Sequence, residues 1–416
     1  VYSPADVRFA MAEEDRAETL IVSKPLVLTG GFQVFADQLY NRFIQLLAVA
    51  AGATVDQLGV LNAAKSLSGN ILQMFFGRAA DRFGKRRFIS AGRLLNGAVL
   101  AAIIFIEAPE WLIPLIVLCS IFVSMALPSW NSLLGDYAPE GRRGEVIGRI
   151  NSLTQIGGLT AMLIALSISL SQSGPSTRAS FIPVMAMASG ASILSGVLVL
   201  FTKERRHEQQ STSLDFSKLL GDLRLRRYLI LNTLYGVGMA FAWPLFPFII
   251  TEELGMTVWQ VAILAITETA ANIVTQRFTG GLMDRVGRRP IIVFSRVVMA
   301  LAPLSYALAT SWLHIVVAEV FLGMGMGAWM GSESTYAIDL APGELRATYL
   351  AASATAFGLA SFGGSLLGSF VTEHILTSGG IEAIKTGLLI SAGLRLVLGL
   401  AYSAAYESRP GKPQRP

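Results

Sequence analysis

The sequence predicts an all-α membrane protein in which twelve transmembrane helices form two six-helix bundles related by a pseudo-twofold axis. Three observations predict this fold class. The chain is 53% hydrophobic and only 15% charged, whereas soluble domains carry about 25% charged residues. Apolar runs of about 20 residues, long enough to cross a bilayer as helices, recur twelve times. The second half of the chain also repeats motifs of the first half at a fixed offset of 203 residues.

The apolar runs fall into two groups of six, separated by the longest polar segment. In the first half the predicted helices are 26–50, 57–76, 88–106, 111–137, 146–170 and 181–201. In the second half they are 228–250, 257–279, 290–310, 312–338, 346–371 and 385–405. The predicted domains are therefore an N-terminal cytoplasmic segment (1–24), a first bundle (25–201), a cytoplasmic linker (202–227), a second bundle (228–405) and a cytoplasmic tail (406–416).

The basic residues predict the orientation, because Lys and Arg accumulate in cytoplasmic loops. With the N-terminus inside, the 33 Lys and Arg residues fall in inner segments or the adjoining helix ends, except for Arg42, Lys65, Arg178, Lys385 and Arg395. We therefore expect a multi-pass protein of the cell (inner or plasma) membrane with both termini in the cytoplasm. The first 24 residues are too acidic for a cleavable signal peptide, so the first helix is expected to direct targeting.

Composition and motifs argue against several classes of function. The net charge of +5 is spread over short loops without a basic domain, which argues against nucleic-acid binding. Cys119 is the single cysteine and the three histidines are far apart, which argues against a disulfide framework or a metal site. No phosphate-binding G-x-x-x-x-G-K-[ST] motif occurs. We expect no cofactor and no enzymatic activity, and a monomer whose partners are the lipid bilayer and a small-molecule substrate.

The internal repeat is clearest in two short, charged stretches. The segment "GRAADRFGKRR" begins at Gly77, and its copy "GGLMDRVGRR" begins at Gly280. The offset of 203 residues also relates Thr54-Val55-x-Gln57 to Thr257-Val258-x-Gln260. A register kept over three predicted helices indicates a duplication.

The sequence resembles the major facilitator superfamily of transporters, whose signature between the second and third helices is G-x-x-x-D-R-x-G-R-R. Here the signature is matched with one conservative change, Lys85. The resemblance implies two parallel six-helix halves around a central cavity. It also implies that Asp81 and Asp284, with Arg143 and Arg346 nearby, hold the halves together on the cytoplasmic side, where each carboxylate meets a helix N-terminus of the opposite half.

The glycines of the two motifs are expected to form the tight turns between helices, and the charged residues to form the gate. The residues predicted for this cytoplasmic gate are Gly77, Asp81, Arg82, Gly84, Arg86, Arg87, Asp136, Arg143, Gly280, Asp284, Arg285, Gly287, Arg288, Arg289, Asp339 and Arg346.

Polar side chains inside the predicted helices indicate where a substrate binds, because such groups usually face the bundle interior or a water-filled cavity. Five polar residues of the first helix, 37–45, share one sector of about 140°. The family resemblance implies that this helix lines the cavity, with Asp37 and Arg42 as the strongest candidates. Lys65 and Glu268 lie 203 residues apart with opposite charges, and they fit a binding role or a structural ion pair.

The seventh predicted helix adds a narrow face of polar and aromatic residues above Pro244 and Pro247, which are expected to break the helix. The full set of predicted substrate- or proton-binding residues is Asp37, Gln38, Asn41, Arg42, Gln45, Lys65, Asn232, Tyr235, Trp243, Glu268, Asn272 and Glu319.

Three functions remain open. The first is a proton-coupled exporter of amphipathic compounds, with Asp37 as the proton carrier. The second is a proton symporter of a small organic anion or nutrient, in which Arg42 and Lys65 bind the anion. The third is a transporter-like receptor or a lipid-translocating protein, which the duplicated gate motif disfavours. The Gly-Pro pair of the family's antiporters is absent from the fifth helix, and the fourth helix lacks a sugar-porter arginine.

Overall fold

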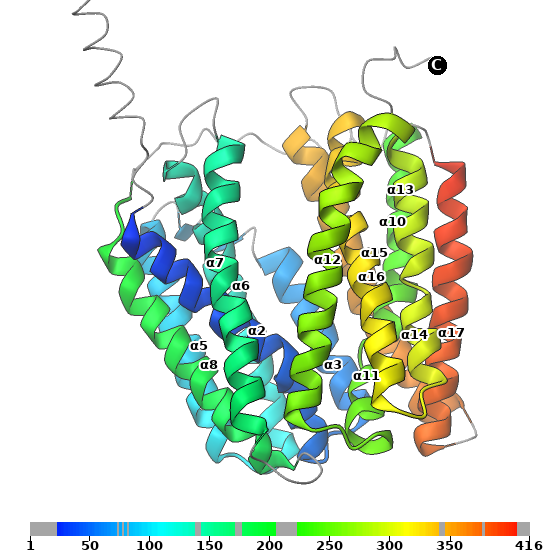
Figure 1. Ribbon diagram of the computed structural model, residues 1–416, viewed down its shortest axis with the longest axis horizontal. Coiled ribbons are helices and arrows are strands. Elements are labelled where there is room, and N and C mark those ends of the chain that lie inside the picture. Colours follow the sequence, from blue (N-terminus) through cyan, green and yellow to red (C-terminus); the bar gives the residue numbers. More distant parts are fainter. Residues whose placement is uncertain are drawn as a thin grey trace, which may run out of the picture.

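The computed structural model describes residues 23–405 with eight gaps, at 73–74, 77–78, 81–82, 138–142, 171–176, 205–222, 341–345 and 377–378. In this part of the chain the regular structure is entirely helical. Long helices run side by side and form a barrel-like bundle (Figure 1). The absence of strands among the described residues agrees with the predicted all-α class.

The described helices follow one another along both halves of the chain, and several of them are interrupted. In the first half the elements are α2 (Lys24–Ala50), α3 (Val55–Leu67) with the π-helical turn η1 (Ser68–Leu72), α5 (Lys85–Phe105), α6 (Pro109–Tyr137), α7 (Arg143–Ser169), and α8 (Arg178–Leu198) with η2 (Val199–Phe201). In the second half they are α10 (Leu223–Phe241) with α11 (Phe246–Phe248) and η3 (Ile249–Glu253), α12 (Val258–Val286), α13 (Arg288–Val298) with α14 (Leu301–Ala307), α15 (Trp312–Leu340), α16 (Arg346–Phe370) with η5 (Val371–Ile375), and α17 (Gly380–Ala401) with η6 (Tyr402–Ala404).

Ten helical segments in the described part of the chain are long and apolar enough to cross a membrane. They coincide with the third to twelfth predicted spans. The first two passages, α2 and α3, are outside this set. Helix α2 carries the ionisable pair Asp37 and Arg42 among several amides, and α3 has only 13 residues before it continues as η1. A polar face on these two helices fits a position next to a cavity.

The repeated Thr-Val-x-Gln motif begins a helix in each half. The N–H of Thr54 donates to Gln57 Oε1 at 3.0 Å, and the Gln57 N–H donates to Thr54 Oγ1 at 3.3 Å. The N–H of Thr257 likewise donates to Gln260 Oε1 at 2.7 Å. These capping boxes satisfy N–H groups that have no partner in the first turn of α3 and α12. The same residues therefore start the same helix in both copies of the repeat.

The repeated glycines have the backbone geometry that the motif requires. Gly84 has φ of 95° and Gly287 has φ of 98°, a left-handed region that glycine enters without steric cost. Each glycine immediately precedes a helix, α5 or α13. A residue with a side chain would be strained at either turn.

Helix packing repeats between the halves. In the first half α2 packs against α7 and α8, and α5 packs against α6 and α8. In the second half the equivalent contacts are α10 with α16 and α17, and α13 with α15 and α17. The halves meet mainly where α3 packs against α16 and where α7 packs against α12. In Figure 1 the first-half helices α5, α6, α7 and α8 lie on the left, α3 and α12 lie near the middle, and the second-half helices α13, α14 and α17 lie on the right.

The hydrophobic core differs between the two ends of the molecule. At the end that contains Thr54 and Thr257, one buried cluster joins both halves, for example Leu47 and Leu58 with Ile249 and Val261. Toward the opposite end, which contains Gly84 and Gly287, the buried clusters of the described residues each come from one half. We call these the Thr54 end and the Gly84 end. The halves are therefore joined by apolar packing at the Thr54 end.

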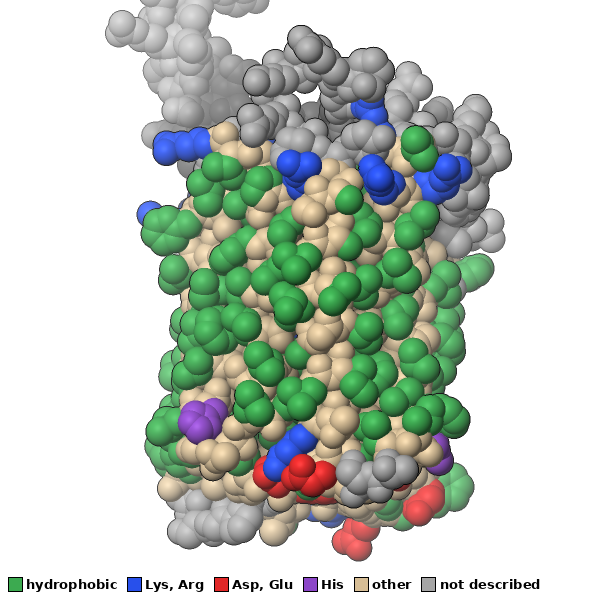
Figure 2. Space-filling model, turned by 90° about the vertical axis from the view of Figure 1, so that its right-hand side faces the viewer, with side chains coloured by type: hydrophobic (Ala, Val, Ile, Leu, Met, Phe, Trp, Pro, Cys, Tyr) green, Lys and Arg blue, Asp and Glu red, His purple; other side chains and the backbone are tan. Residues whose placement is uncertain are grey.

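Charged side chains are segregated along the same axis. In Figure 2, Lys and Arg side chains gather near the upper end, and an apolar band separates them from acidic side chains at the lower end. The Thr54 end includes the exposed Asp56–His374 contact and the Lys385–Glu253 ion pair. An apolar band between two polar ends is the surface that a bilayer requires.

Two helices of the second half are interrupted, and the first break is the one predicted from Pro244 and Pro247. Helix α10 ends at Phe241, and a turn containing Pro244 leads into α11. A second break separates α13 from α14, where Pro303 has no N–H for the carbonyl of Met299. Both breaks leave backbone carbonyls without an intrahelical partner in an apolar environment.

The fully buried Arg395 of α17 satisfies both breaks. Its Nη1 donates to the carbonyl of Met299 at 3.1 Å, and its Nη2 donates to the carbonyl of Met239 at 2.7 Å. The guanidinium also lies over the ring of Phe246, with 5.9 Å between its carbon and the ring centroid. The sequence offered no partner for Arg395, because its partners are backbone carbonyls exposed by helix breaks.

Candidate functional site

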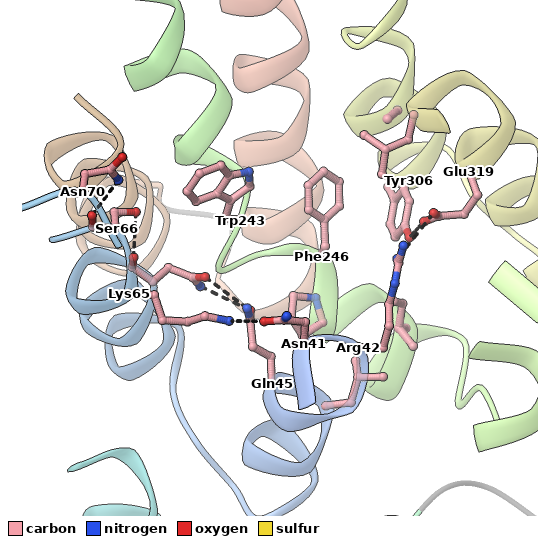
Figure 3. Close-up of a pocket in the computed structure, with 16 residues that line it drawn as sticks. Asn41, Arg42, Gln45, Lys65, Ser66, Asn70, Trp243, Phe246, Tyr306 and Glu319 are labelled. Atoms are coloured by element: carbon pink, nitrogen blue, oxygen red, sulfur yellow. Dashed lines mark hydrogen bonds and ion pairs between the residues drawn. The ribbon is translucent and has the colours of Figure 1, made fainter. Parts of the chain in front are cut away.

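A cavity of about 480 Å³ lies between the two halves (Figure 3). From the first half it is lined by Asn41, Arg42, Gln45, Leu46, Asn62, Lys65, Ser66 and Asn70, and from the second half by Trp243, Phe246, Pro247, Ile250, Ala302, Tyr306, Glu319 and Leu322. The first-half wall is mostly polar, whereas the second-half wall is mostly aromatic and aliphatic.

Helical spacing explains the polar wall. Asn41 and Gln45 are four residues apart on α2, and Asn62, Ser66 and Asn70 follow one another at intervals of four along α3 and η1. Residues four apart lie on the same face of a helix. The two polar faces predicted from the sequence therefore lie side by side in the same cavity.

Arg42 connects the halves through two carboxylates. Its guanidinium forms an ion pair with Glu268 of α12, and its Nη1 lies 3.8 Å from Oε2 of Glu319 on α15. The other oxygen of Glu319 accepts a hydrogen bond of 2.7 Å from the hydroxyl of Tyr306, and Glu319 is only 2% exposed. One cation from the first half is thus shared by two acids of the second half.

The remaining polar groups of the wall pair mainly with one another. Gln45 and Asn62 exchange two amide hydrogen bonds, of 3.0 and 3.2 Å. Lys65 Nζ donates to Asn41 Oδ1 at 3.3 Å and lies 5.1 Å from the centroid of the Tyr40 ring. In Figure 3 the Lys65 ammonium and the Gln45 amide point toward the centre of the view, opposite Trp243 and Phe246.

Asp37 lies outside the lining of this cavity. Its two carboxylate oxygens accept hydrogen bonds from Arg93 of α5 at 2.6 and 2.9 Å. The Arg93 side chain is fully buried, while that of Asp37 is 26% exposed. The structure pairs Asp37 within its own half and pairs Arg42 across the halves.

A second polar cluster surrounds Arg296, the repeat counterpart of Arg93. Its Nη2 lies 3.3 Å from Glu333 Oε2 and 3.3 Å from Asn232 Oδ1. Tyr235 donates to the backbone carbonyl of Arg296 at 3.0 Å, and its ring stacks on the guanidinium. Asn232 and Tyr235 are therefore buried in this cluster rather than on the cavity wall.

Of the predicted binding residues, six line the cavity and Glu268 contacts it through Arg42. The six are Asn41, Arg42, Gln45, Lys65, Trp243 and Glu319. Asp37, Gln38, Asn232, Tyr235 and Asn272 lie outside the lining. Asn272 contributes through its backbone, which packs closely against α15.

The packing of α12 against α15 depends on glycine. A Cβ on Gly323 would overlap the backbone carbonyl of Glu268, and one on Gly327 would overlap the carbonyl oxygen of Asn272. Small residues four apart allow helices to approach this closely. The approach keeps Glu268 and Glu319 on adjacent helices within reach of Arg42.

We expect Gly323→Val to destabilise the protein by about 1–3 kcal/mol or more, because the new side chain forces α12 and α15 apart. Thermal unfolding of the purified protein would measure the loss. Gly363→Val is the matched control, since Gly363 on α16 is exposed and a Cβ there meets no atom within 4 Å. Equal unfolding temperatures for the two variants would contradict close packing at Gly323.

The described gate residues hold helix ends within their own half. Arg86 donates to the carbonyls of Leu200 and Thr202 at 3.2 and 2.7 Å. Its counterpart Arg289 donates to the carbonyls of Ser403 and Ala405, at 3.2 and 3.5 Å, and these positions are again 203 residues further on. Arginine beside the carboxyl end of a helix is favourable, because carbonyls and the helix dipole are exposed there.

Glu204 completes the first copy of this arrangement. Its carboxylate accepts hydrogen bonds from the backbone N–H groups of Lys85 and Arg86 at 2.6 and 3.5 Å and lies 3.5 Å from Nε of Arg86. It therefore caps the start of α5. The sequence carried a signal for this residue, since Glu407 stands 203 positions later, in a segment outside the described residues.

The other gate predictions divide into two groups. Arg288 is buried, as is Lys85 at the equivalent position of the first copy, which was not among the predicted gate residues, whereas Arg87 and Arg285 are exposed. The predicted gate residues that lie outside the described residues, or whose side chains do, are Gly77, Asp81, Arg82, Asp136, Arg143, Gly280, Asp284, Asp339 and Arg346. Helices α7 and α16 begin at the repeat-related Arg143 and Arg346. The predicted latch between the halves stays a prediction.

Sequence reasoning missed several residues of the site. Phe246 and Tyr306 line the cavity, and Arg93 is the partner of Asp37. Arg93 carried a signal, because an arginine at the same place in both copies of the repeat lies well inside a predicted helix. Such a residue needs a partner, but only the tertiary structure, in which α2 and α5 both pack against α8, identifies it.

Comparisons with known proteins agree with the geometry. The profile of the Major Facilitator Superfamily matches residues 26–242 and 228–416. The uncharacterised MFS-type transporter YhjO of Bacillus subtilis is 23% identical over 381 residues, which cover 85% of this chain and 90% of that protein. The multi-drug resistance efflux pump PmrA of Streptococcus pneumoniae is 21% identical over 69% of this chain and 72% of that protein.

A shorter match, to an uncharacterised MFS-type transporter of Methanocaldococcus jannaschii, is 27% identical over 27% of this chain and 29% of that protein. Among solved structures, the nucleoside transporter NupG superposes with a TM-score of 0.74 at 16% identity, covering 92% of this chain and 98% of that chain. At this identity the superposition shows a shared fold. Because the family profile covers nearly the whole sequence and the fold agrees with it, the chain belongs to the major facilitator superfamily.

Proposed function

We propose that the protein is a secondary active transporter that carries a small solute by alternating access. In this proposal twelve helices cross the membrane as two six-helix bundles related by a pseudo-twofold axis. The repeated helix contacts, with α2–α8 answered by α10–α17 and α2–α7 by α10–α16, support this arrangement.

The observation that carries the proposal is a cavity that both halves line. An ion pair at this cavity joins the two halves. Arg42 of the first half contacts Glu268 and Glu319 of the second. Apolar packing joins the halves at the Thr54 end, whereas the described clusters toward the Gly84 end each belong to one half. A cavity bounded in this way changes its access when the halves rock about it.

We place the Gly84 end and both termini in the cytoplasm of a cell-membrane protein. The basic side chains near one end of Figure 2 support this orientation. The gate proposal remains that Asp81 and Asp284, with Arg143 and Arg346, hold the Gly84 ends of the halves together when the cavity opens at the Thr54 end.

We assign proton coupling to Glu319 in preference to Asp37. The Asp37 carboxylate is held by two hydrogen bonds from a fully buried Arg93 within the first half, and it lies outside the cavity lining. Glu319 is buried at the cavity wall, and its nearest cation is shared with Glu268. A carboxylate whose counter-ion can move to a second acid is suited to binding and releasing a proton.

Glu319→Gln tests this assignment. The glutamine keeps a hydrogen-bonding group but carries no ionisable proton, so we expect loss of solute accumulation driven by a pH gradient while solute exchange continues. Proteoliposomes with an internal pH dye, challenged with small carboxylates, their amides and amphipathic cations, provide the measurement. Glu373→Gln, an exposed substitution at the Thr54 end, is the control. Undiminished accumulation by Glu319→Gln would refute the assignment.

The same assay tests export of amphipathic compounds. The aromatic second-half wall formed by Trp243 and Phe246 and the similarity to PmrA favour this alternative for the substrate. Proton flux elicited by amphipathic cations, and not by carboxylates, would support it. A receptor or a lipid-translocating protein would give no solute-dependent proton flux.

A further inference from the structure

We propose that Lys65 forms the binding site for the carboxylate of a small organic monoanion, whose apolar part packs against Trp243 and Phe246. This inference rests on the proposed function, because it assigns the substrate class of the same cavity. It follows from a comparison of the cations that lie inside the bundle.

Lys65 differs from the other internal cations in its partners. Arg42, Arg93 and Arg296 each have a carboxylate within 4 Å, and Arg395 has two backbone carbonyls. In the described part of the chain, Lys65 contacts one neutral amide oxygen and one aromatic ring, and the buried thiol of Cys119 lies nearby. An ammonium has three N–H donors, and this one lines a cavity large enough for a ligand.

The groups around Lys65 match an anion with an apolar body. The amides of Asn41 and Gln45 stand on the same wall, and they can donate to a carboxylate after a change in their own pairing. Across the cavity lie Trp243, Phe246 and Leu322. A volume of about 480 Å³ holds a small aromatic or aliphatic acid and falls within the range of small-molecule sites.

The charge balance favours a single negative charge on the ligand. Arg42 and Lys65 carry two positive charges, and Glu268 and Glu319 carry two negative charges when ionised. Both acids contact Arg42, so Lys65 is the cation left for a ligand. A bound monoanion adds one negative charge, and a proton on Glu319 would restore neutrality. A cationic ligand would instead meet the Lys65 ammonium.

Matched ligand pairs test the proposal directly. Benzoate and benzamide, nicotinate and nicotinamide, and indole-3-acetate and indole-3-acetamide differ in charge but hardly in shape. We expect the detergent-purified protein to bind at least one carboxylate more than tenfold more tightly than its amide, measured by calorimetry and by thermal stabilisation. Benzyltrimethylammonium is included as an amphipathic cation.

Three variants and one control variant locate the effect. Lys65→Gln is expected to abolish the preference for carboxylates, and Lys65→Arg to retain it. Asn41→Asp places a carboxylate of the protein itself beside Lys65, so it should abolish binding of an added carboxylate although the lysine is unchanged. This variant should be at least as stable as the wild type, because the new carboxylate pairs with the Lys65 ammonium. Lys385→Gln removes a positive charge at the Thr54 end, where Lys385 pairs with Glu253 and Glu382, and it should leave binding unchanged.

The outcomes separate this proposal from the proposed function, because binding in detergent needs neither a gradient nor alternation. Carboxylate binding that persists in Lys65→Gln and Asn41→Asp would overturn the assignment. Equal binding of acids and amides, or binding of the cation alone, would also overturn it. Carboxylate binding together with unaltered accumulation by Glu319→Gln would leave the Lys65 site intact and refute only the coupling residue.

Discussion

Asp37→Asn is expected to destabilise the protein by about 3 kcal/mol, the low end of the cost of breaking a buried ion pair, because Arg93 is fully buried while the Asp37 side chain is 26% exposed. Arg93 is fully buried, and both of its terminal nitrogens donate to Asp37 at 2.6 and 2.9 Å. An asparagine supplies one acceptor oxygen and no charge. The variant would leave an uncompensated guanidinium between α2, α5 and α8.

Thermal unfolding of purified Asp37→Asn measures this loss, with Asp56→Asn as the control. Asp56 pairs with His374 at an exposed site, where a pair contributes about 0–1 kcal/mol. The double variant Asp37→Asn with Arg93→Met removes both charges and should recover part of the stability. A single Asp37→Asn variant that unfolds like the wild type but fails to accumulate solute would return the coupling role to Asp37.

Arg395→Met is expected to have the second large effect. The methionine fills similar space but leaves the carbonyls of Met239 and Met299 without their side-chain donor. Each buried unsatisfied carbonyl costs about 1–3 kcal/mol. The loss of stability would be concentrated at the two helix breaks, between α10 and α11 and between α13 and α14. Both breaks lie in the second half, next to the cavity.

The measurement is again thermal unfolding, combined with hydrogen exchange of the peptides that contain the two breaks. Arg395→Lys should be intermediate, since one shorter ammonium cannot reach both carbonyls. Arg226→Met, at an exposed position near the start of α10, controls for the loss of an arginine. Unchanged exchange at both breaks in Arg395→Met would show that the guanidinium does not stabilise them.

The helices and the repeat could be predicted because both depend on patterns that are visible in the sequence itself. Apolar runs, prolines and the Thr-x-x-Gln caps act over a few residues, and the 203-residue offset is visible without coordinates. The polar faces of α2 and α3 were equally accessible, since helical periodicity alone places Asn41 beside Gln45 and Asn62 beside Ser66.

The pairing of charges could not be predicted in the same way, because it depends on which helices pack together. Asp37 and Arg93 are 56 residues apart, and Arg42 meets an acid 226 positions away. The internal repeat does not predict these pairings either. Arg93 and Arg296 occupy equivalent positions, yet their carboxylates come from α2 in one half and α15 in the other.

The apolar cluster shared by the halves at the Thr54 end has a calorimetric consequence. Parting the halves there would expose side chains such as Leu47, Ile249 and Val261, so that opening would carry a positive heat-capacity change. Hydrophobic attraction weakens on cooling. Low temperature should therefore shift the resting distribution toward conformers that are open on that side, and kosmotropic salts should shift it back.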